Sequence, residues 1–247
     1  VTIAPPVADI ATTDAVVEIS NGTSTVTTTE TVIFDTEASV SLVTATVEAD
    51  GIVNAAEASD GVVLTGTVEA GSTVVVTVAG VDYDATVTGG SWSVTIPSVA
   101  PGEYDLDVSV TATDAYGNTV TTSGTVVVDT MTDIVMATGL VAGDGTVNAA
   151  EHAAGTTVTG YAEAGASVVV TIGSASHTVT AGADGAWSAT FAASEIPTGT
   201  YDATVTAVST DLAGNTASAT GTIHIDTENS LSINTANVET DGTVNGA

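Results

Sequence analysis

An acidic octet occurs twice in the chain and begins a third time near its C-terminal end. It is DGIVNAAE at Asp50–Glu57, DGTVNAAE at Asp144–Glu151, and DGTVNGA at Asp241–Ala247. Each copy offers carboxylates and a side-chain amide, and its glycine allows a tight turn that aims successive backbone carbonyls to one side. Calcium prefers oxygen ligands of these three kinds and takes six to eight of them at about 2.3–2.6 Å. The octet therefore predicts part of a repeated calcium site.

Other landmarks keep the same spacing as the octet. The pair Asp-Thr occurs at Asp35, Asp129 and Asp226, at intervals of 94 residues (35 to 129) and 97 residues (129 to 226), and each pair stands 15 residues before an octet. Such a period suits one whole small domain. We expect residues 1–36 to be the tail of an earlier module, 37–130 and 131–227 to be two complete modules, and 228–247 to open the next.

Short β-strands are predicted throughout each module. Runs rich in Val, Thr and Ile alternate with Gly, Asn, Asp and Pro, and no helical period lasts more than a turn or two. Seven short strands in about a hundred residues favour an all-β fold of tandem seven-stranded immunoglobulin-like β-sandwich domains in a linear array. A Gly-x-Tyr before the sixth strand supports this, because a tyrosine at that corner can hydrogen-bond back to the chain. In the first complete module the strands are expected near 40–48, 62–68, 73–79, 83–88, 92–96, 104–113 and 119–128.

The charge balance excludes several classes of partner. The chain has 30 acidic residues and no Lys or Arg, a formal net charge of −30. No basic patch can meet nucleic acid or an anionic membrane surface, and no apolar run is long enough to insert directly into a membrane. Without cysteines or lysines, the chain can form neither disulfides nor Lys–Asn crosslinks. Packing and bound cations are the remaining means of stiffening it.

Six acidic positions coincide between the two complete modules. These modules hold 13 and 9 acids over about 94 positions, so independent placement would give roughly one coincidence. The shared acids favour ligation, whereas the unshared ones fit a solvated acidic surface. The pairs are Asp50 with Asp144, Glu57 with Glu151, Glu69 with Glu163, Asp105 with Asp202, Asp114 with Asp211, and Asp129 with Asp226.

Alternating strand directions place these acids at the two poles of a module. The octet and Asp129 are expected at one pole, and Glu69 and Asp114 at the other; Asp105 shares the octet pole, where a plain solvated corner is an equal alternative. Head-to-tail stacking would bring opposite poles of neighbouring modules together, so the predicted cofactor is Ca²⁺ at the junctions. The predicted ligands are Asp35, Asp50, Asn54, Glu57, Glu69, Asp105, Asp114, Asp129, Asp144, Asn148, Glu151, Glu163, Asp202, Asp211, Asp226 and Asp241, with Asn54 having capping of the loop as its alternative role.

Other chemistry is weakly supported. Three histidines do not recur between the modules, so a shared zinc or catalytic role is disfavoured. The tryptophans Trp92 and Trp187 follow glycine turns and are expected to fill cores rather than stack on sugars. The sequence NGT at Asn21 predicts a turn rather than a glycosylation site. No nucleophile has a partner in repeat register, and we expect no enzyme.

The combination DGxVNAAE, GxWS, GxY, TDxxGNT and DT resembles the bacterial immunoglobulin-like repeats of giant calcium-binding surface adhesins, which are exported by type I secretion and often end in RTX segments. The resemblance covers nearly the whole chain, but the first module has Ser20 near the place of the loop Asp. It implies an extracellular structural extender whose partners are neighbouring modules of the same chain, with the adhesive tip outside this fragment. The alternative is a ligand-binding module that recognises a glycan or a partner protein.

Overall fold

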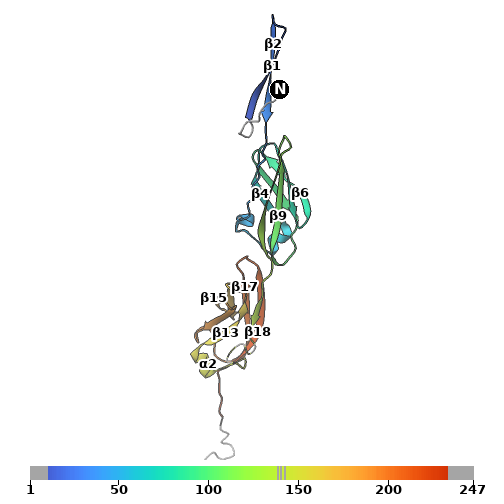
Figure 1. Cartoon of the computed structure of the whole chain (residues 1–247). Helices are drawn as coiled ribbons and strands as arrows, with labels where there is room; N and C mark the ends of the chain where they lie inside the picture. The colour runs from blue at the N-terminus through green and yellow to red at the C-terminus, as the bar shows by residue number, and fades with distance from the viewer. Residues whose placement is uncertain (1–10, 138, 140, 142, 233–247) are drawn as a thin grey trace, which may run out of the picture. The chain divides into compact units, whose positions relative to one another are not determined.

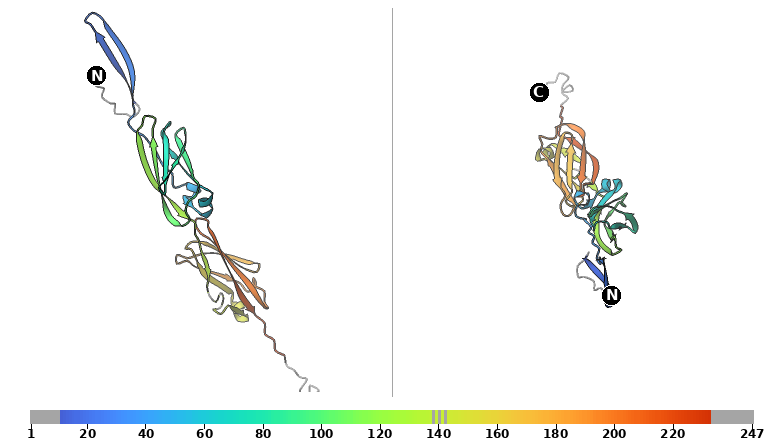
Figure 2. Two further views of the ribbon diagram at one scale, coloured as in Figure 1. Left: turned by 90° about the vertical axis from the view of Figure 1, so that its right-hand side faces the viewer. Right: turned by 90° about the horizontal axis from the view of Figure 1, so that it is seen from above.

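The computed structural model describes residues 11–137, 139, 141 and 143–232 (Figure 1). The chain divides into two compact units, Val1–Met131 and Thr132–Ala247. Each unit contains a β-sandwich, and the first also contains a two-stranded hairpin, dark blue in the two further views of Figure 2. The predicted all-β, immunoglobulin-like fold is confirmed.

The first unit pairs a five-stranded sheet with a three-stranded one. The larger sheet has the order β3-β10-β9-β5-β6 and the smaller has the order β4-β8-β7, whereas β1 and β2 pair only with each other. The elements are β1 (Ala11–Ser20), β2 (Thr25–Phe34), η1 (Val47–Ala49), β3 (Ile52–Val53), α1 (Ala55–Asp60), β4 (Val62–Thr67), β5 (Thr73–Val78), β6 (Val81–Asp84), β7 (Thr86–Thr88), β8 (Ser91–Ile96), β9 (Glu103–Thr113) and β10 (Thr119–Asp129).

The second unit also pairs a five-stranded sheet with a three-stranded one, but β11 joins β13 at the edge of its smaller sheet, whereas β7 joins β8 in the first unit. Its sheets have the orders β12-β18-β17-β14-β15 and β11-β13-β16. The elements are β11 (Ile134–Met136), β12 (Thr146–Asn148), α2 (Ala149–Ala154), β13 (Thr156–Ala162), β14 (Ser167–Ile172), β15 (Ala175–Thr180), β16 (Ala186–Phe191), β17 (Thr200–Thr210) and β18 (Thr216–Asp226).

A buried tryptophan lies in the core of each sandwich. Trp92 is 2% exposed and Trp187 is 3% exposed, which confirms that both fill cores. The Trp92 indole lies against Gly66, where a Cβ atom would come within 2.6 Å of it, and its Nε1 donates a hydrogen bond to the Ser41 carbonyl at 2.9 Å. Glycine is therefore required on the strand that the indole covers.

The corner before the sixth predicted strand is held as the sequence predicts. The hydroxyl of Tyr104 donates a hydrogen bond to the carbonyl of Ala100, four residues upstream, at 2.7 Å. The hydroxyl of Tyr201 donates to the carbonyl of Pro197 at 2.7 Å. Both sandwiches therefore fix this corner with the same bond.

The segment 40–48 is not the continuous strand that the sequence predicts. Two isolated bridges, at Val40 and Val43, are followed by the short helix η1. Glu48 and Ala49 have positive φ angles of 51° and 81°, which end the extended conformation. The predicted strand 83–88 is also divided, because β6 joins the larger sheet and β7 the smaller.

Ala49 and Gly143 give a test of local strain, since each directly precedes an octet. Gly143 has a φ of 83° and nothing within 4 Å of the position that a Cβ would occupy, so the same left-handed backbone is adopted by alanine in one repeat and by glycine in the other. A non-glycine residue in the left-handed conformation costs the folded state about 1–2 kcal/mol. Glycine avoids this cost, but it also raises the conformational entropy of the unfolded chain, which offsets part of the gain in stability. Ala49→Gly should raise the free energy of unfolding of its sandwich by about 0.5–1 kcal/mol, and Gly143→Ala should lower that of the other by about 1 kcal/mol.

Urea denaturation followed by the fluorescence of Trp92 and Trp187 measures both changes. Destabilisation by Ala49→Gly would contradict the assignment of strain to this position.

Candidate metal centre

The octet folds into a strand, a helix cap and a short helix. The Asp50 carboxylate accepts a hydrogen bond from the Ile52 amide at 3.0 Å. Asn54 Oδ1 accepts from the amides of Ala56 at 3.0 Å and Glu57 at 3.1 Å, while Glu57 Oε2 accepts from the Asn54 amide at 2.9 Å. This reciprocal pair is a capping box, which satisfies backbone donors at the start of α1.

The second copy of the octet makes the same bonds. Asp144 accepts from the Thr146 amide at 2.9 Å, and Asn148 and Glu151 form the capping box of α2. In both repeats the octet is a folding signal, and capping is the role that the structure gives Asn54 and Asn148. Metal ligation by the octet residues stays a prediction.

Strand pairing places each octet beside the end of the last strand of its sandwich. β3 runs parallel to β10 with Val53 opposite Val128, and β12 runs parallel to β18 with Asn148 opposite Asp226. The octet and Asp129 thus share one pole. Asp105 lies on β9 opposite Val127 near the same pole, and it is exposed. Asp202 lies at the equivalent position on β17 and pairs with His224 at 2.7 Å.

The opposite pole of the first sandwich holds a tightly bonded acidic loop. Asp114 follows β9 and is 7% exposed. Its Oδ1 accepts hydrogen bonds from the amides of Tyr116 at 2.8 Å, Gly117 at 2.7 Å and Asn118 at 2.8 Å. The Asp114 amide in turn donates to the Asn118 carbonyl at 3.0 Å. These bonds close the loop in one defined conformation that fixes the direction of the carboxylate.

Asn118 joins two carboxylates at this pole. Its Nδ2 donates to Asp114 Oδ2 at 2.7 Å and to Asp35 Oδ1 at 3.1 Å, and it contacts the Asp35 carbonyl at 3.2 Å. Asp35 directly follows β2, so the end of the hairpin meets the far loop of the sandwich that comes after it. Glu69 lies in the turn between β4 and β5, and its amide donates to the Ser39 carbonyl at 3.3 Å. The segment after Asp35 therefore passes this turn.

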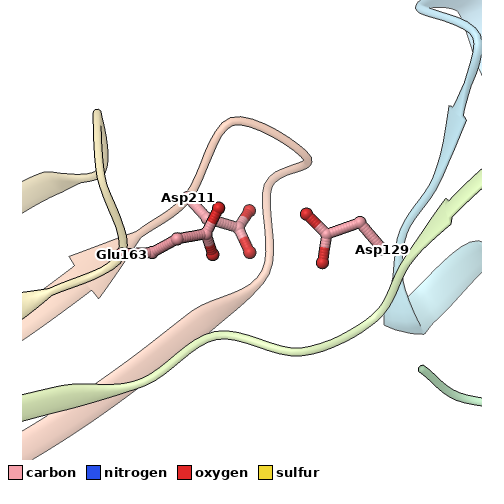
Figure 3. Close-up of side chains that lie close together, drawn as sticks. All are labelled: Asp129, Glu163 and Asp211. Carbon is pink, nitrogen blue, oxygen red and sulfur yellow. The ribbon is translucent and has the colours of Figure 1, made fainter. Parts of the chain in front are cut away.

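The second unit brings together the two acids that are equivalent to Glu69 and Asp114. Glu163 comes from the turn between β13 and β14, and Asp211 follows β17. Carboxylate oxygens of the two lie within 4.8 Å of one another. Figure 3 shows the side chains of Glu163 and Asp211 lying close together. Asp211 is 7% exposed and accepts from the amide of Asn215 at 2.8 Å and from its Nδ2 at 2.8 Å. Asp129, also labelled in Figure 3, is the last residue of β10 in the other unit.

This pair of carboxylates fits a cation. At a separation of 4.8 Å, two like charges repel by about 1 kcal/mol in bulk water and by about 3–4 kcal/mol at an effective dielectric constant near 20. The chain has no Lys or Arg to offset that repulsion. Hard carboxylate and carbonyl oxygens are the ligands that calcium takes, so the donor set is chemically suited to it.

Sequence reasoning missed the asparagines at this pole. Asn118 and Asn215 occupy the same place in the TDxxGNT motif, and that shared place was a usable signal. By sequence, Ser20 stands near the position of the loop Asp in the first module. Ser20 is the last residue of β1, and Asn21 is the first residue of the turn, as Asp114 is after β9. Asp241 lies outside the described residues.

The threonine of each Asp-Thr pair also has a structural role that the sequence did not indicate. Thr130 Oγ1 accepts a hydrogen bond from the Gly102 amide at 2.7 Å, and Thr227 Oγ1 accepts from the Gly199 amide at 2.8 Å. Both glycines belong to the Gly-x-Tyr corner. The end of the last strand is therefore tied to that corner next to Asp129 and Asp226.

The three histidines have separate partners. His152 is buried, with Nε2 2.8 Å from the Ile196 carbonyl, and His177 pairs with Glu195 at 2.9 Å. His224 pairs with Asp202. Within the described ranges they do not form a common metal site with other acids or histidines.

Comparison with known proteins identifies the family. Residues 136–227 match the model of the bacterial Ig-like domain. A 1.5-MDa bacterial ice-binding adhesin, studied for its retention on the host cell surface, is 30% identical over 88% of this chain and 75% of that chain, with a TM-score of 0.47. The chain belongs to the bacterial Ig-like domain family. The family assignment rests on the identity and on the family model, not on the superposition.

Two further similar structures are described as parts of adhesins or adhesion proteins. A Ca²⁺-stabilized adhesin, which helps an Antarctic bacterium reach out and bind ice, is 32% identical over 87% of this chain, with a TM-score of 0.47; this chain spans 56% of its length. A tetra-tandem repeat from the extending region of a large adhesion protein is 24% identical over 87% of this chain and 56% of that chain, with a TM-score of 0.37. No curated protein matches the sequence closely enough to count as a relative. None of the described helices is long and apolar enough to span a membrane.

The Asp114 loop predicts an acid-sensitive contribution to stability. Burial alone would raise the pKa of Asp114, but hydrogen bonds from the Asn118 side chain and from the amides of Asn118, Tyr116 and Gly117 outweigh it and lower the pKa. A lowered pKa in the folded state stabilises the fold fully above the unfolded value of about 3.9, and this contribution is lost as the pH falls through the folded pKa.

Urea denaturation in chelator between neutral pH and pH 2 tests this expectation. Asp114→Asn should reduce the loss of stability of the first sandwich below about pH 4. Asp107→Asn is the matched control, because Asp107 is an exposed acid on β9, the strand that leads into the Asp114 loop. If, below about pH 4, the free energy of unfolding falls in Asp114→Asn as much as in the unsubstituted chain, the expectation is contradicted.

Proposed function

We propose that the chain is part of the structural extender of a bacterial cell-surface adhesin and that calcium bound at its domain junctions makes it rigid. In this proposal the modules are spacers located outside the cell, they catalyse no reaction, and their partners are the neighbouring modules. Whatever the complete adhesin binds is recognised by a tip outside this fragment.

The observation that carries the proposal is the meeting of Asp35 and Asp114 at Asn118. Asp35 ends one repeat and Asp114 belongs to the next, and a single side-chain amide donates to both carboxylates, at 3.1 Å and 2.7 Å. Acids from two consecutive repeats, Asp35 and Asp114, thus lie close to one another within one unit. Calcium binding there would replace mutual repulsion by shared coordination.

The repeat extends this arrangement to the next junction. Asp129, Glu163, Asp211 and Asn215 are the equivalents of Asp35, Glu69, Asp114 and Asn118. Asp129 precedes Thr132, the first residue of the second unit, by three residues, and three residues of extended chain reach roughly 10 Å. We therefore assign Asp129 to the same calcium as Glu163 and Asp211, with backbone carbonyls and water completing the six to eight ligands.

The remaining predicted ligands belong to this proposal with less support. The octet acids and Asp105, Asp202 and Asp226 lie at the other pole, where hydrogen bonds within the sandwich already engage most of them. They would bind calcium through the carboxylate oxygens that do not take part in these hydrogen bonds. The primary ligands in this proposal are the acids of the pole that holds Asp114 or Asp211, together with Asp35 or Asp129 of the preceding repeat.

The similar proteins favour a spacer over a ligand-binding module. One is described as a Ca²⁺-stabilized adhesin that reaches out, and another as the extending region of a large adhesion protein. Both tryptophans are buried and cannot stack on a sugar. Tyr116 and Tyr161 are exposed, but the other repeat has Ala213 and Thr67 at the equivalent positions, so neither tyrosine forms a repeated aromatic platform.

Calcium binding should be measurable through thermal stability. Excess chelator should lower the melting temperature, because ligand binding to the folded state alone stabilises it by about 2.7 kcal/mol at a hundredfold excess over the dissociation constant. Glu163→Gln with Asp211→Asn should reduce the calcium-dependent shift, and it should raise the melting temperature measured in chelator by removing the repulsion.

Asp60→Asn with Asp107→Asn is the matched control, since it removes two exposed, unshared acids for the same change in net charge. It should leave the calcium-dependent shift intact. Identical melting curves of the unsubstituted chain in calcium and in chelator would refute a structural calcium role, and an equal loss of the shift in both double variants would refute the assigned ligands.

A further inference from the structure

Asn21 stands in the turn of the β1–β2 hairpin and is followed by Gly22. We infer that Asn21 is a self-modifying site: its side-chain amide is lost by deamidation in the folded protein, and a carboxylate takes its place. The hairpin thereby gains the acid that the two following repeats already have.

The position of Asn21 is equivalent to that of two aspartates. In the hairpin, Ser20 pairs with Thr25 and Asn21 begins the turn, and in the first sandwich, Thr113 pairs with Thr119 and Asp114 begins the turn. Asp211 begins the corresponding turn after β17. Asn21 is therefore the neutral member of a set whose other members are acids.

The turn surrounds Asn21 Oδ1 with donors. It accepts hydrogen bonds from the Thr23 amide at 3.0 Å, the Ser24 amide at 2.9 Å and the Thr23 hydroxyl at 3.0 Å. Attack on the side-chain carbonyl carbon moves negative charge onto Oδ1. Three donors already directed at that oxygen stabilise the charge in the manner of an oxyanion hole.

The attacking atom is the backbone nitrogen of Gly22. Gly22 has a φ of 88°, and as a glycine it has no Cβ that would hinder ring closure at its nitrogen. Its N–H points to Ser20 Oγ at 3.3 Å, a hydroxyl through which the proton can pass to solvent. Ring closure forms the bond from Gly22 N to Asn21 Cγ, and the Cγ–Nδ2 bond breaks as Nδ2 takes a proton and leaves as ammonia.

Water then opens the cyclic imide and leaves a carboxylate: breaking the bond from Gly22 N to Cγ gives aspartate, and breaking the bond from Gly22 N to the backbone carbonyl carbon of residue 21 gives isoaspartate. The net change is addition of one water and loss of one ammonia, with no oxidant or reductant. The turn amides that polarise the Asn21 carbonyl also favour the charged product, as the amides around Asp114 do. Use of this new acid for cation binding rests on the proposed function, whereas the deamidation itself does not.

Peptide mapping of the folded chain measures the reaction directly. The chain has no Lys or Arg for trypsin, but cleavage after glutamate releases residues 19–30, which contain Asn21. Samples held at mildly alkaline pH in buffer or in concentrated urea are digested at acidic pH, and the mass gain of this peptide gives the two rates. Residues 240–247, released by the same digestion, contain the second Asn-Gly pair. Its deamidation rate in buffer and in urea corrects for the effect of the solvent on the reaction itself.

The expected result is a deamidation rate for Asn21 that is at least about threefold higher in buffer than in urea. This ratio is well below the effect of an oxyanion-hole donor in an enzyme, because the turn is exposed to water. Thr23→Val removes the hydroxyl donor and should slow the reaction in buffer but not in urea. Slower reaction in buffer than in urea, or no effect of Thr23→Val in buffer, would overturn the inference. Both outcomes are independent of calcium, so the inference and the proposed function can fail separately.

Discussion

Repulsion between carboxylates is the constraint on which the rest of this chain depends. The chain has thirty acids and no Lys or Arg, and the ion pairs in the part of the chain that the structure describes are those of His177 and His224. The sandwiches fold because their buried faces are apolar, and most acids remain at the surface, where water screens them. At the pole that holds Asp114 in the first sandwich and Asp211 in the second, these aspartates are buried, and Glu163 lies close to Asp211, so a bound cation has repulsion to offset there.

The immunoglobulin-like topology creates that pole from short turns. Turns after β9 and β17 hold their aspartates with backbone amides, and turns after β4 and β13 supply glutamates beside them. The asparagine at the end of the turn adds an amide that can donate to a carboxylate of the preceding repeat, as Asn118 does to Asp35. Backbone geometry thus orders the acids before any ion is bound, which lowers the entropic cost of binding.

Much of this could be predicted from the sequence, and the reasons for success and failure are physical. The alternation of Val and Thr predicted the strands, and repeated tryptophans and tyrosines predicted the core and the corner, because these patterns depend on burial alone. The segment 40–48 was misjudged, because left-handed residues are set by single backbone angles. The capping box of the octet was expected only as an alternative role of Asn54, because it is set by local hydrogen bonds. The acids Glu163 and Asp211 were predicted to lie at one pole, but the hydrogen bond from the Asn215 side chain to Asp211 is known only from the atomic contacts.

Small-angle X-ray scattering of the whole chain tests the central claim most directly. Asp129→Asn with Asp211→Asn, which removes acids assigned to the two sides of one junction, is compared with the unsubstituted chain in millimolar calcium and in excess chelator. If calcium locks the junction, the unsubstituted chain should keep its largest maximum dimension only in calcium, and the variant should resemble the chelated chain in both conditions while its circular dichroism retains the β-signal. A maximum dimension that is the same for the unsubstituted chain in calcium and in chelator would contradict calcium-dependent rigidity.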